Sequence, residues 1–470
     1  MRKVMGVFLA CIFIFSLMLS GCGENAGEKS ALEGSGEIEK VIISVESKGS
    51  PADSTRGTNI VEAAKELNKI LEEKNDNRRV EVIHNHDSTG GDDDFNKKFF
   101  LAWQSGKGAD ILVTGHNNVA LYAEGGYVLQ LDDLITNSEF KKYLDEIYPN
   151  LWEAAKYNGK TYAIPQDAET RPIYFRKDVL RKMGWTEEQI NELPEKIENG
   201  EFSLQDMVAL AKEAKDKGLV KWGIYHRPTN GAFFTMMVKD FGGKVYDDKE
   251  EKIVLDKKAV IETLKFFKDI ARDSKVTPSG MTAAEWKGIH KDWVEGKVLF
   301  WFGGTWHWAE YQKVPYHSEL GKLSEEYMFD NMGYALTPAA KKGGEPITLT
   351  QPYVYMINSK TKHPDLAFAL AAIASKPEYN AVHAVESGHL AISPATAKQP
   401  KYEENRFLAS VSYMLDYTIT QPNTSLWNKY TGVLYKAVQA VELGRQTPEE
   451  AVNWMEEQLK NDLGDKLIIM

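Results

Sequence analysis

Residues 295–311, EGKVLFWFGGTWHWAEY, are the most informative stretch of the chain for its fold class. Val298–Phe302 is an unbroken run of five apolar residues, which predicts a strand buried on both faces, as in a parallel sheet. Gly303 and Gly304 then predict a turn, and Thr305 is expected to cap a helix that follows. The segment therefore predicts one strand–turn–helix unit of an α/β fold.

The tryptophans in and before this unit are expected to have different roles. Trp306 falls in the first turn of the helix, at the carboxyl end of the strand, which is where ligands bind in open α/β sheets. Trp301 belongs to the strand and is expected in the core. Trp286 and Trp293 share one face of the preceding helix and are also expected in the core. For Trp308, core and ligand site remain open.

Upstream, the pattern alternates between strand and helix. Runs at residues 41–45 and 80–83 and the segment GADILV at 108–113 predict three short strands. Apolar residues at helical spacing between positions 60 and 71 predict a helix between the first two. The βαβαβ order predicts a parallel sheet with helices on both faces. A length of 470 residues, 43% hydrophobic and 27% charged, is typical of two or three globular domains.

The N-terminus predicts export. Two basic residues precede an apolar stretch at residues 7–19, which is short for a membrane span. The sequence LSGC at 19–22 resembles a bacterial lipobox. This implies a lipoprotein signal peptide at residues 1–21 and lipidation of Cys22. The small, polar residues 22–37 are then expected to form a flexible lipidated tether. A plain secretory signal with an incidental cysteine is the alternative.

Cleavage of the signal peptide would determine which cysteine thiols remain in the mature chain and what its net charge is. Cys11 would leave with the signal and Cys22 would carry lipid, so no thiol remains for a disulfide, a nucleophile or a metal cluster. Losing two basic residues changes the net charge of −11 to −13. So acidic a chain is a poor nucleic-acid binder.

Eight segments, in order, resemble the extracellular solute-binding proteins of sugar ABC importers, the group that includes maltodextrin-binding protein. They are GADILV, YAEGGYVLQLDDLI, NGKTYAIP, FGGKVYDDKEEKIVLD, WVEGKVLFWFGGTW, YALTP, the run from ASKPEYN to ESGHLAISP, and ELGRQTPEEAV. The resemblance covers nearly all of the mature chain. It implies an α/β, periplasmic-binding-protein-like fold with two discontinuous lobes joined by a multi-strand hinge.

The resemblance also implies the boundaries of the lobes. The N-lobe is expected at residues 38–164 and 333–393, and the C-lobe at residues 165–332 and 394–470. The hinge strands are expected at residues 165–171, near 331–334 and near 393.

The same resemblance implies where an oligosaccharide would bind. Trp306 matches a position that stacks on a sugar ring. Glu169 matches an acidic position on the hinge, with a plain salt bridge as its alternative. Arg171, two residues further along an extended strand, is expected to face the same side. Charged side chains suit sugar hydroxyls because charge-assisted hydrogen bonds are short and strong.

Further candidates follow predicted strands or begin later elements. His116, Asn117 and Asn118 stand where the family often has aromatic and charged contacts, which suggests a ligand different from maltodextrin. Asparagine still offers a paired donor and acceptor to a hydroxyl. The other candidates are Glu46, Lys48, Arg227, Asn230, Gln351 and Trp427.

Two competing sites are disfavoured. His84 and His86 share a strand face close to the acidic run at residues 92–94, so a metal site is conceivable. A solvated loop and helix N-terminus explains those acids better, and we expect no metal and no cofactor. Asp167 and Glu169 resemble a glycosidase pair, but neighbours on one strand face lie too close together to flank a scissile bond.

The sequence therefore predicts a membrane-anchored, extracytoplasmic, monomeric lipoprotein without enzymatic activity. It would capture an oligosaccharide by hinge closure and deliver it to an ABC transporter permease. A β-linked gluco-, xylo- or manno-oligosaccharide is favoured. The alternatives are a secreted lipoprotein glycoside hydrolase and a protein of the same fold that binds a non-sugar solute.

Overall fold

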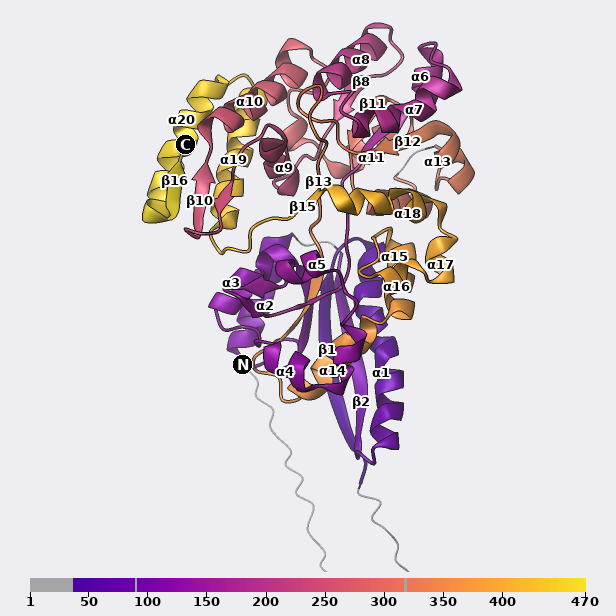
Figure 1. Ribbon diagram of the computed structural model, residues 1–470, viewed down its shortest axis with the longest axis vertical. Helices are drawn as coiled ribbons and strands as arrows, with labels where there is room; N and C mark the ends of the chain where they lie inside the picture. The colour runs from indigo at the N-terminus through magenta and orange to yellow at the C-terminus, as the bar shows by residue number, and fades with distance from the viewer. Residues whose placement is uncertain (1–36, 89–90, 317–318) are drawn as a thin grey trace, which may run out of the picture. The chain divides into compact units, whose positions relative to one another are not determined.

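The computed structural model describes residues 37–88, 91–316 and 319–470, without the side chains of Asp92 and Asp93 (Figure 1). The expected signal peptide, the lipid on Cys22 and nearly all of the tether lie outside the described residues and stay predictions. Within the described part, no helix has the length and apolar character needed to cross a membrane. Residues 39–470 form one compact unit.

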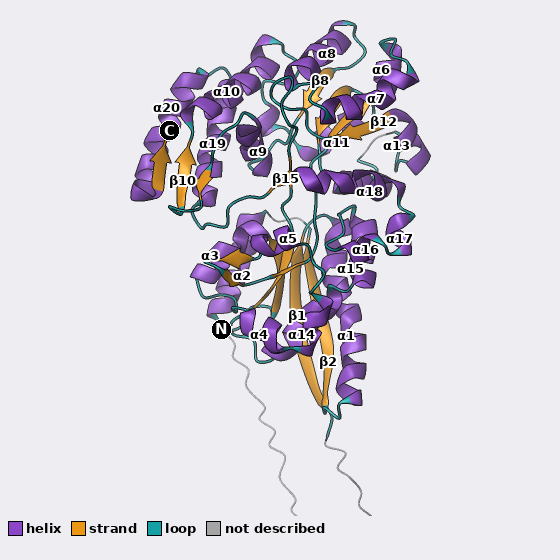
Figure 2. Ribbon diagram, in the orientation of Figure 1, coloured by secondary structure: helices purple, strands orange, loops and turns teal. Residues whose placement is uncertain are grey.

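Two larger sheets organise this unit (Figure 2). The first has the order β2-β1-β3-β14-β6, with the strands β1 (Glu39–Lys48), β2 (Arg78–Asp87), β3 (Ile111–Gly115), β6 (Ile164–Pro165) and β14 (Tyr353–Ile357). The second has the order β12-β7-β11-β8, with the strands β7 (Ile173–Arg176), β8 (Trp222–Tyr225), β11 (Val298–Phe302) and β12 (Met332–Ala335). The remaining short strands are β4 (Lys156–Tyr157), β5 (Lys160–Thr161), β9 (Tyr246–Asp247), β10 (Lys252–Leu255), β13 (Thr348–Leu349), β15 (Thr418–Ile419) and β16 (Leu467–Ile469).

Helices surround both sheets. Up to β11 they are α1 (Thr55–Glu73), α2 (Asp92–Gln104), α3 (Val119–Glu124), α4 (Asp132–Asn137), α5 (Pro149–Ala154), α6 (Lys177–Lys182), α7 (Glu187–Glu198), α8 (Leu204–Asp216), α9 (Ala232–Asp240), α10 (Lys257–Lys268) and α11 (Trp286–Val294). After β11 they are α12 (Trp306–Lys313), α13 (Glu325–Asn331), α14 (Pro364–Ala374), α15 (Pro377–Ser387), α16 (Pro394–Ala397), α17 (Pro400–Glu403), α18 (Arg406–Val411), α19 (Trp427–Glu442) and α20 (Pro448–Leu463).

The predicted βαβαβ unit is confirmed in the first sheet. Strand β1 pairs in parallel with both β2 and β3, and helices α1 and α2 connect these strands. Side chains of a strand alternate between the two faces of a sheet. Ile111 of β3 accordingly belongs to the same apolar cluster as Ile60 of α1, whereas Leu112 packs with Phe99 of α2. Helices α1 and α2 thus cover opposite faces.

The predicted strand at Val298–Phe302 is confirmed as β11, and all five of its side chains are buried. It pairs in parallel with β8 but antiparallel with β7, so the second sheet is mixed rather than purely parallel. Thr305 is the N-cap residue of α12, as expected, but its buried hydroxyl has no hydrogen-bond partner among the described residues and makes no side-chain cap. The N–H of Gly304 donates instead to Nδ1 of His307, at 2.9 Å.

The lobe boundary expected at residue 333 falls within strand β12. Strand β12 pairs along its whole length with β7, so the chain stays in the second sheet as far as Ala335. Two connections between the sheets follow directly from the strand order, at residues 166–172 and 336–352. Within the second connection β13 pairs with β15, and Figure 1 shows these short strands between the two sheets.

The tryptophans divide as follows. Trp293 and Trp301 are fully buried, which confirms their core assignment. Trp308, left open by the sequence, is also core: it is 3% exposed and its ring lies 4.5 Å from that of Phe407, nearly parallel to it. The core assignment of Trp286 is wrong in part. As the first residue of α11 it is half-buried and lines a cavity.

One buried carboxyl group lies against the connection at residues 336–352. Asp240, the last residue of α9, accepts a hydrogen bond from the Ala340 N–H at 3.2 Å. Its other oxygen is buried and has no hydrogen-bond partner among the described residues. Burial raises the pKa of Asp240 to about 7. The ionised form of this side chain is therefore costly in the folded protein.

We expect the stability of the protein to be greatest near pH 6.5. Burial lowers the pKa of four histidines to about 3 or 4, namely His84, His116, His290 and His389. In the unfolded chain they bind protons near pH 6.5, so stability rises as the pH increases from 4 to 6.5. Burial raises the pKa of Glu169 and Asp240 to about 7 and of Glu310 to about 8. These acids keep a proton in the folded protein that the unfolded chain has lost, so from about pH 4 they oppose the effect of the histidines, and above pH 6.5, where that effect ends, they make stability fall up to pH 8.

The variant Asp240→Asn tests this. It should raise the free energy of unfolding at pH 8 by roughly 1–3 kcal/mol, because the neutral amide removes the buried negative charge, and raise it less at pH 5, where the folded protein keeps the carboxyl group protonated. Denaturant unfolding at both pH values measures the difference. The control is Asp216→Asn, whose carboxylate is exposed. Equal effects of Asp240→Asn at both pH values would contradict the assignment.

Candidate functional site

A cavity of about 1570 Å³ lies between elements of the two sheets. Residues from the end of β1 and the start of β14, such as Lys48 and Tyr353, contribute to one side. Residues after β8 and β11, such as Arg227 and Trp306, contribute to the other. The volume exceeds the roughly 300–1,000 Å³ of most small-molecule pockets. The cavity therefore has room for a ligand of several rings.

Nine of the twelve residues predicted to contact a ligand line this cavity. They are Lys48, Asn117, Glu169, Arg171, Arg227, Asn230, Trp306, Gln351 and Trp427. Their contact with a ligand stays a prediction. Trp427 is only 2% exposed and stacks on Tyr430, so it offers little surface for a sugar ring.

The structure does not place the other three on the cavity wall. His116 and Asn118 are buried in the turn after β3, where Asn118 donates to Thr114 and accepts from Asn96, both at 3.0 Å. Only Asn117 of this run faces the cavity, and it accepts from Gln351 at 2.8 Å. Glu46 precedes Lys48 by two residues, and this places it about 6–7 Å back from the carboxyl end of β1.

Trp306 lies where the connection at residues 166–172 meets the cavity. Arg171 from this connection holds its guanidinium 5.0 Å from the centre of the Trp306 ring. The ring of His389 is nearly parallel to the indole, at 5.7 Å. A Cβ atom at residue 304 would lie 2.1 Å from the indole of Trp306. Because Gly304 has no Cβ atom, the ring can fold back over the turn. These contacts fix the orientation of Trp306.

Glu169 and Arg171 form a pair beside this ring. Nη2 of Arg171 donates to Glu169 at 2.5 Å and also approaches Oε1 of Gln351 at 3.4 Å. Burial raises the pKa of Glu169 to about 7, against the opposing effect of Arg171. The pair thus places a carboxyl group and a guanidinium together at the cavity wall, which is a donor and acceptor set suited to hydroxyls.

The opposite wall is formed by the loop after β8. The Arg227 guanidinium donates to the carbonyl oxygens of Thr229 and Asn230, at 2.7 and 2.9 Å. Its centre lies 5.9 Å from the ring of Trp286. These bonds hold the loop in a fixed conformation, with Arg227, Asn230 and Trp286 on the cavity.

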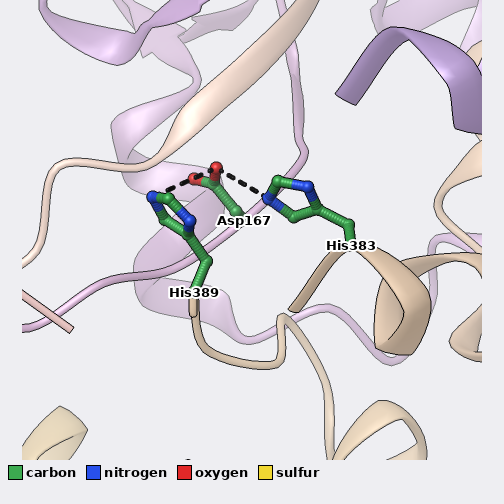
Figure 3. A group of neighbouring side chains, drawn as sticks. All are labelled: Asp167, His383 and His389. Carbon is green, nitrogen blue, oxygen red and sulfur yellow. Dashed lines mark hydrogen bonds and ion pairs between the residues drawn. The ribbon is translucent and has the colours of Figure 1, made fainter. Parts of the chain in front are cut away.

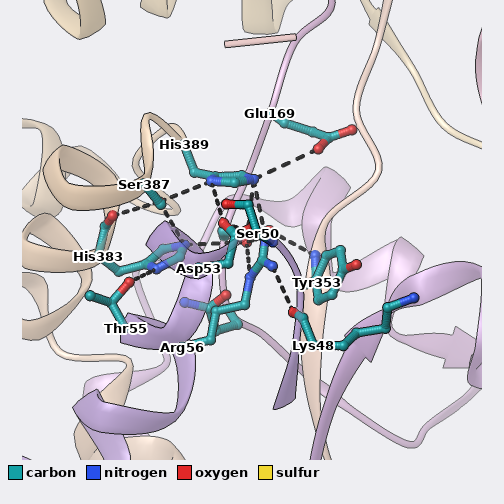
Figure 4. A network of polar contacts seen from close by, with 12 residues as sticks. Lys48, Ser50, Asp53, Thr55, Arg56, Glu169, Tyr353, His383, Ser387 and His389 are labelled. Carbon is teal, nitrogen blue, oxygen red and sulfur yellow. Dashed lines mark hydrogen bonds and ion pairs between the residues drawn. The ribbon is translucent and has the colours of Figure 1, made fainter. Parts of the chain in front are cut away.

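A buried ionic network that the sequence did not predict lies behind the site (Figure 4). Arg56 of α1 donates through Nε to one oxygen of Asp167, at 2.9 Å, and its Nη2 forms an ion pair with the same oxygen, at 2.8 Å. Both side chains are almost fully buried. Burial works to raise the pKa of Asp167, but the Arg56 guanidinium outweighs it and holds this pKa well below its usual range. Nη2 of Arg56 also lies 3.0 Å from Nε2 of His389.

The network contains a group of potential metal ligands, Asp167, His383 and His389 (Figure 3). Their ligand atoms lie within 4.8 Å of one another. Arg56 already occupies the Asp167 oxygen and Nε2 of His389 with its hydrogen bonds, and its charge would repel a metal ion. The geometry therefore favours the arginine as the cation of this cluster.

The structure also shows the contacts of the residues in the two disfavoured sites, the metal site and the glycosidase pair. The rings of His84 and His86 both contact the Ser47 hydroxyl, at 2.7 and 2.9 Å, and thereby support the end of β1. Asp167 is paired with Arg56 and does not line the cavity, whereas Glu169 does. The two carboxyl groups therefore do not face each other across a space where a glycosidic bond fits.

Comparison with known proteins shows which family has this architecture. The family of bacterial extracellular solute-binding proteins matches residues 52–381. A maltotriose-binding protein of Pyrococcus abyssi is 27% identical over 44% of this chain, which spans 40% of that relative. The maltodextrin-binding protein MdxE of Bacillus subtilis is 20% identical over 76% of this chain and 79% of its own length.

Solved structures share the fold. The GacH receptor of Streptomyces glaucescens, studied unliganded and with acarbose, superimposes with a TM-score of 0.73 at 19% identity, covering 91% of this chain and all of that one. Maltose-bound MalE3 of Thermotoga maritima gives 0.68 at 20% identity, covering 89% and 99%. The predicted two-lobed, periplasmic-binding-protein-like α/β fold is confirmed. Because the family match extends over more than half of the chain, the protein belongs to the bacterial extracellular solute-binding protein family.

Proposed function

We propose that the protein is a membrane-anchored receptor that captures an oligosaccharide in the cavity and delivers it to an ABC transporter permease. The observation that carries the proposal is the meeting of Trp306 with the Glu169–Arg171 pair at a connection between the sheets. An indole face and a charged hydrogen-bonding pair are complementary to the two kinds of surface that a sugar presents.

The size and lining of the cavity support an oligosaccharide rather than a single sugar. Further aromatic residues line it beyond Trp306, namely Phe233, Trp286, Phe302, Tyr316 and Tyr353. Relatives named for binding maltotriose and maltodextrin share the family. Thr114 in place of an aromatic contact and Asn117 and Asn118 in place of a charged pair support a ligand other than maltodextrin, and we favour a β-linked gluco-, xylo- or manno-oligosaccharide.

Capture would work by closure of two lobes around the ligand. We assign residues 38–164 and 336–393 to one lobe and residues 165–335 and 394–470 to the other, with the boundary moved to include β12 in the second. A ligand that binds the closed form about 5.5 kcal/mol better than the open form switches the population almost completely. An affinity near 1 μM, about −8 kcal/mol, allows both capture and release. Lipid on Cys22 would keep the receptor at the membrane.

The proposal predicts a rise in melting temperature with a specific sugar. The panel consists of maltotriose, cellotriose, xylotriose and mannotriose. Each sugar is added at about 1 mM, which is about 1,000 times the expected Kd. Binding at this concentration should stabilise the native state by about 4 kcal/mol. The same mixtures are then analysed for shorter products. Stabilisation without cleavage is expected. Cleavage would favour the hydrolase alternative, and no response to any sugar would favour a non-sugar solute.

A further inference from the structure

A second polar group lines the cavity next to Trp306. It consists of His290 from α11 and His307 and Glu310 from α12. The two histidines are 4% and 5% exposed, and Glu310 is half-buried. One ligand-type atom from each residue lies within 4.8 Å of the others. The group therefore concentrates three hydrogen-bonding side chains at one place on the wall.

The hydrogen bonds of the two rings leave one nitrogen of each for the cavity. Nδ1 of His307 accepts from the Gly304 N–H at 2.9 Å, so the proton of the neutral ring is on Nε2. Nδ1 of His290 lies 3.1 Å from the Tyr311 hydroxyl. Neither Nε2 atom has a hydrogen-bond partner among the described residues. Neither atom is among the buried polar atoms that lack a partner in the described part of the chain, and both residues line the cavity, so both Nε2 atoms are accessible to a ligand there.

The chemistry of these atoms favours a hydroxyl group over a metal ion. A metal needs the lone pair of a ring nitrogen, but Nε2 of His307 carries the proton. Burial lowers the pKa of both histidines and raises the pKa of Glu310 to about 8. The group is thus uncharged near pH 7. The Tyr316 hydroxyl contacts the carboxyl group of Glu310 and orients it.

We propose that His290, His307 and Glu310 form a subsite that binds the hydroxyl groups of an uncharged sugar ring held beside Trp306. The rings of Trp306 and His307 are 5.0 Å apart, so one sugar unit reaches both the indole and the polar group. A hydroxyl both donates and accepts, and it matches the fixed donor of His307 together with the carboxyl group of Glu310. This inference rests on the proposed function and specifies an uncharged ring as part of the ligand.

Calorimetric titration of variants with the four trisaccharides tests the subsite. His290→Phe keeps an aromatic ring against Trp286 and Tyr316 but removes both nitrogens. Glu310→Ala removes the carboxyl group, whereas Glu310→Gln keeps a neutral donor and acceptor. The control is Lys313→Ala, an exposed residue on the same helix that pairs with Glu386. His307 is left unchanged because its ring also holds the Gly304 turn.

We expect His290→Phe and Glu310→Ala each to weaken the bound trisaccharide at least about tenfold, the typical effect of an unpaired polar partner. Glu310→Gln should weaken binding less than Glu310→Ala, because the amide keeps a neutral donor and acceptor, and Lys313→Ala should bind like the unchanged protein. Thermal melting of the unliganded variants checks that they fold. Comparing Glu310→Ala with Glu310→Gln distinguishes the loss of a polar group from the loss of side-chain packing. Unchanged affinity in His290→Phe and Glu310→Ala would overturn the subsite alone. Absence of binding by the unchanged protein would overturn the proposed function as well.

Discussion

Replacing Arg56 by methionine is expected to lower the free energy of unfolding by about 3–5 kcal/mol, because it leaves a buried carboxylate without its cation. Asp167 has no exposed surface, accepts one hydrogen bond from Nε of the guanidinium and forms an ion pair with Nη2. Its remaining partners are the Tyr353 N–H at 2.7 Å, His383 at 3.3 Å and Nε2 of His389 at 3.9 Å, and none of them carries a permanent charge. Arg56 also donates to the carbonyl oxygen of Lys48. The variant thus loses the link between α1, the end of β1 and the connection at residues 166–172.

Denaturant unfolding at pH 7 measures this loss. The matched control is Arg78→Met, because Arg78 makes ion pairs with Asp76 and Asp365 at partly exposed positions. Such pairs contribute about 0–1 kcal/mol. The double variant Arg56→Met/Asp167→Leu should recover part of the lost stability, since it removes the unpaired charge as well. A cost for Arg56→Met no greater than that for Arg78→Met would show that the network is not a stabilising element.

Replacing Trp306 by alanine is expected to weaken sugar binding by roughly 2–4 kcal/mol, through the joint loss of ring stacking and excluded apolar area. The indole is half-buried and is held by Arg171 and His389, so it is already in place before the ligand arrives. A preorganised ring loses little conformational entropy on binding. The free energy of binding should therefore depend strongly on this one side chain.

Calorimetry with the trisaccharide that the unchanged protein binds measures this effect. Trp103→Ala is the control, because Trp103 is also half-buried but lies on α2 against Lys360, away from the cavity. It should leave the affinity unchanged. Equal affinities of the unchanged protein and Trp306→Ala would remove Trp306 from the site.

The sequence predicted the positions of strands and helices better than it predicted which strands pair with one another. The apolar run of β11 and the alternation of strands and helices up to β3 depend on local composition, and both are confirmed. The sheet to which β12 belongs depends on a long-range pairing with β7. Nothing in its four residues specifies that pairing, so the sequence alone could not place the lobe boundary relative to β12. Side-chain periodicity does not indicate which of two sheets a buried strand joins.

For the site, the sequence predicted which residues line the cavity better at the very end of a strand than in tight turns. Lys48 ends β1 and lines the cavity, whereas in the turn after β3 only the middle residue, Asn117, faces outward. That choice depends on the conformation of one short 3₁₀ turn. Arg56 was missed although a signal existed. It lies four residues before Ile60, on the apolar stripe of α1, and a charged residue on a buried stripe needs a partner.

One calorimetric titration tests the central claim most directly. The purified protein is titrated at pH 7 with maltotriose, cellotriose, xylotriose and mannotriose in turn. We predict saturable binding of at least one of them with one sugar per chain and a Kd on the order of 1 μM. The absence of saturable heat with all four sugars would contradict the account of the protein as an oligosaccharide receptor.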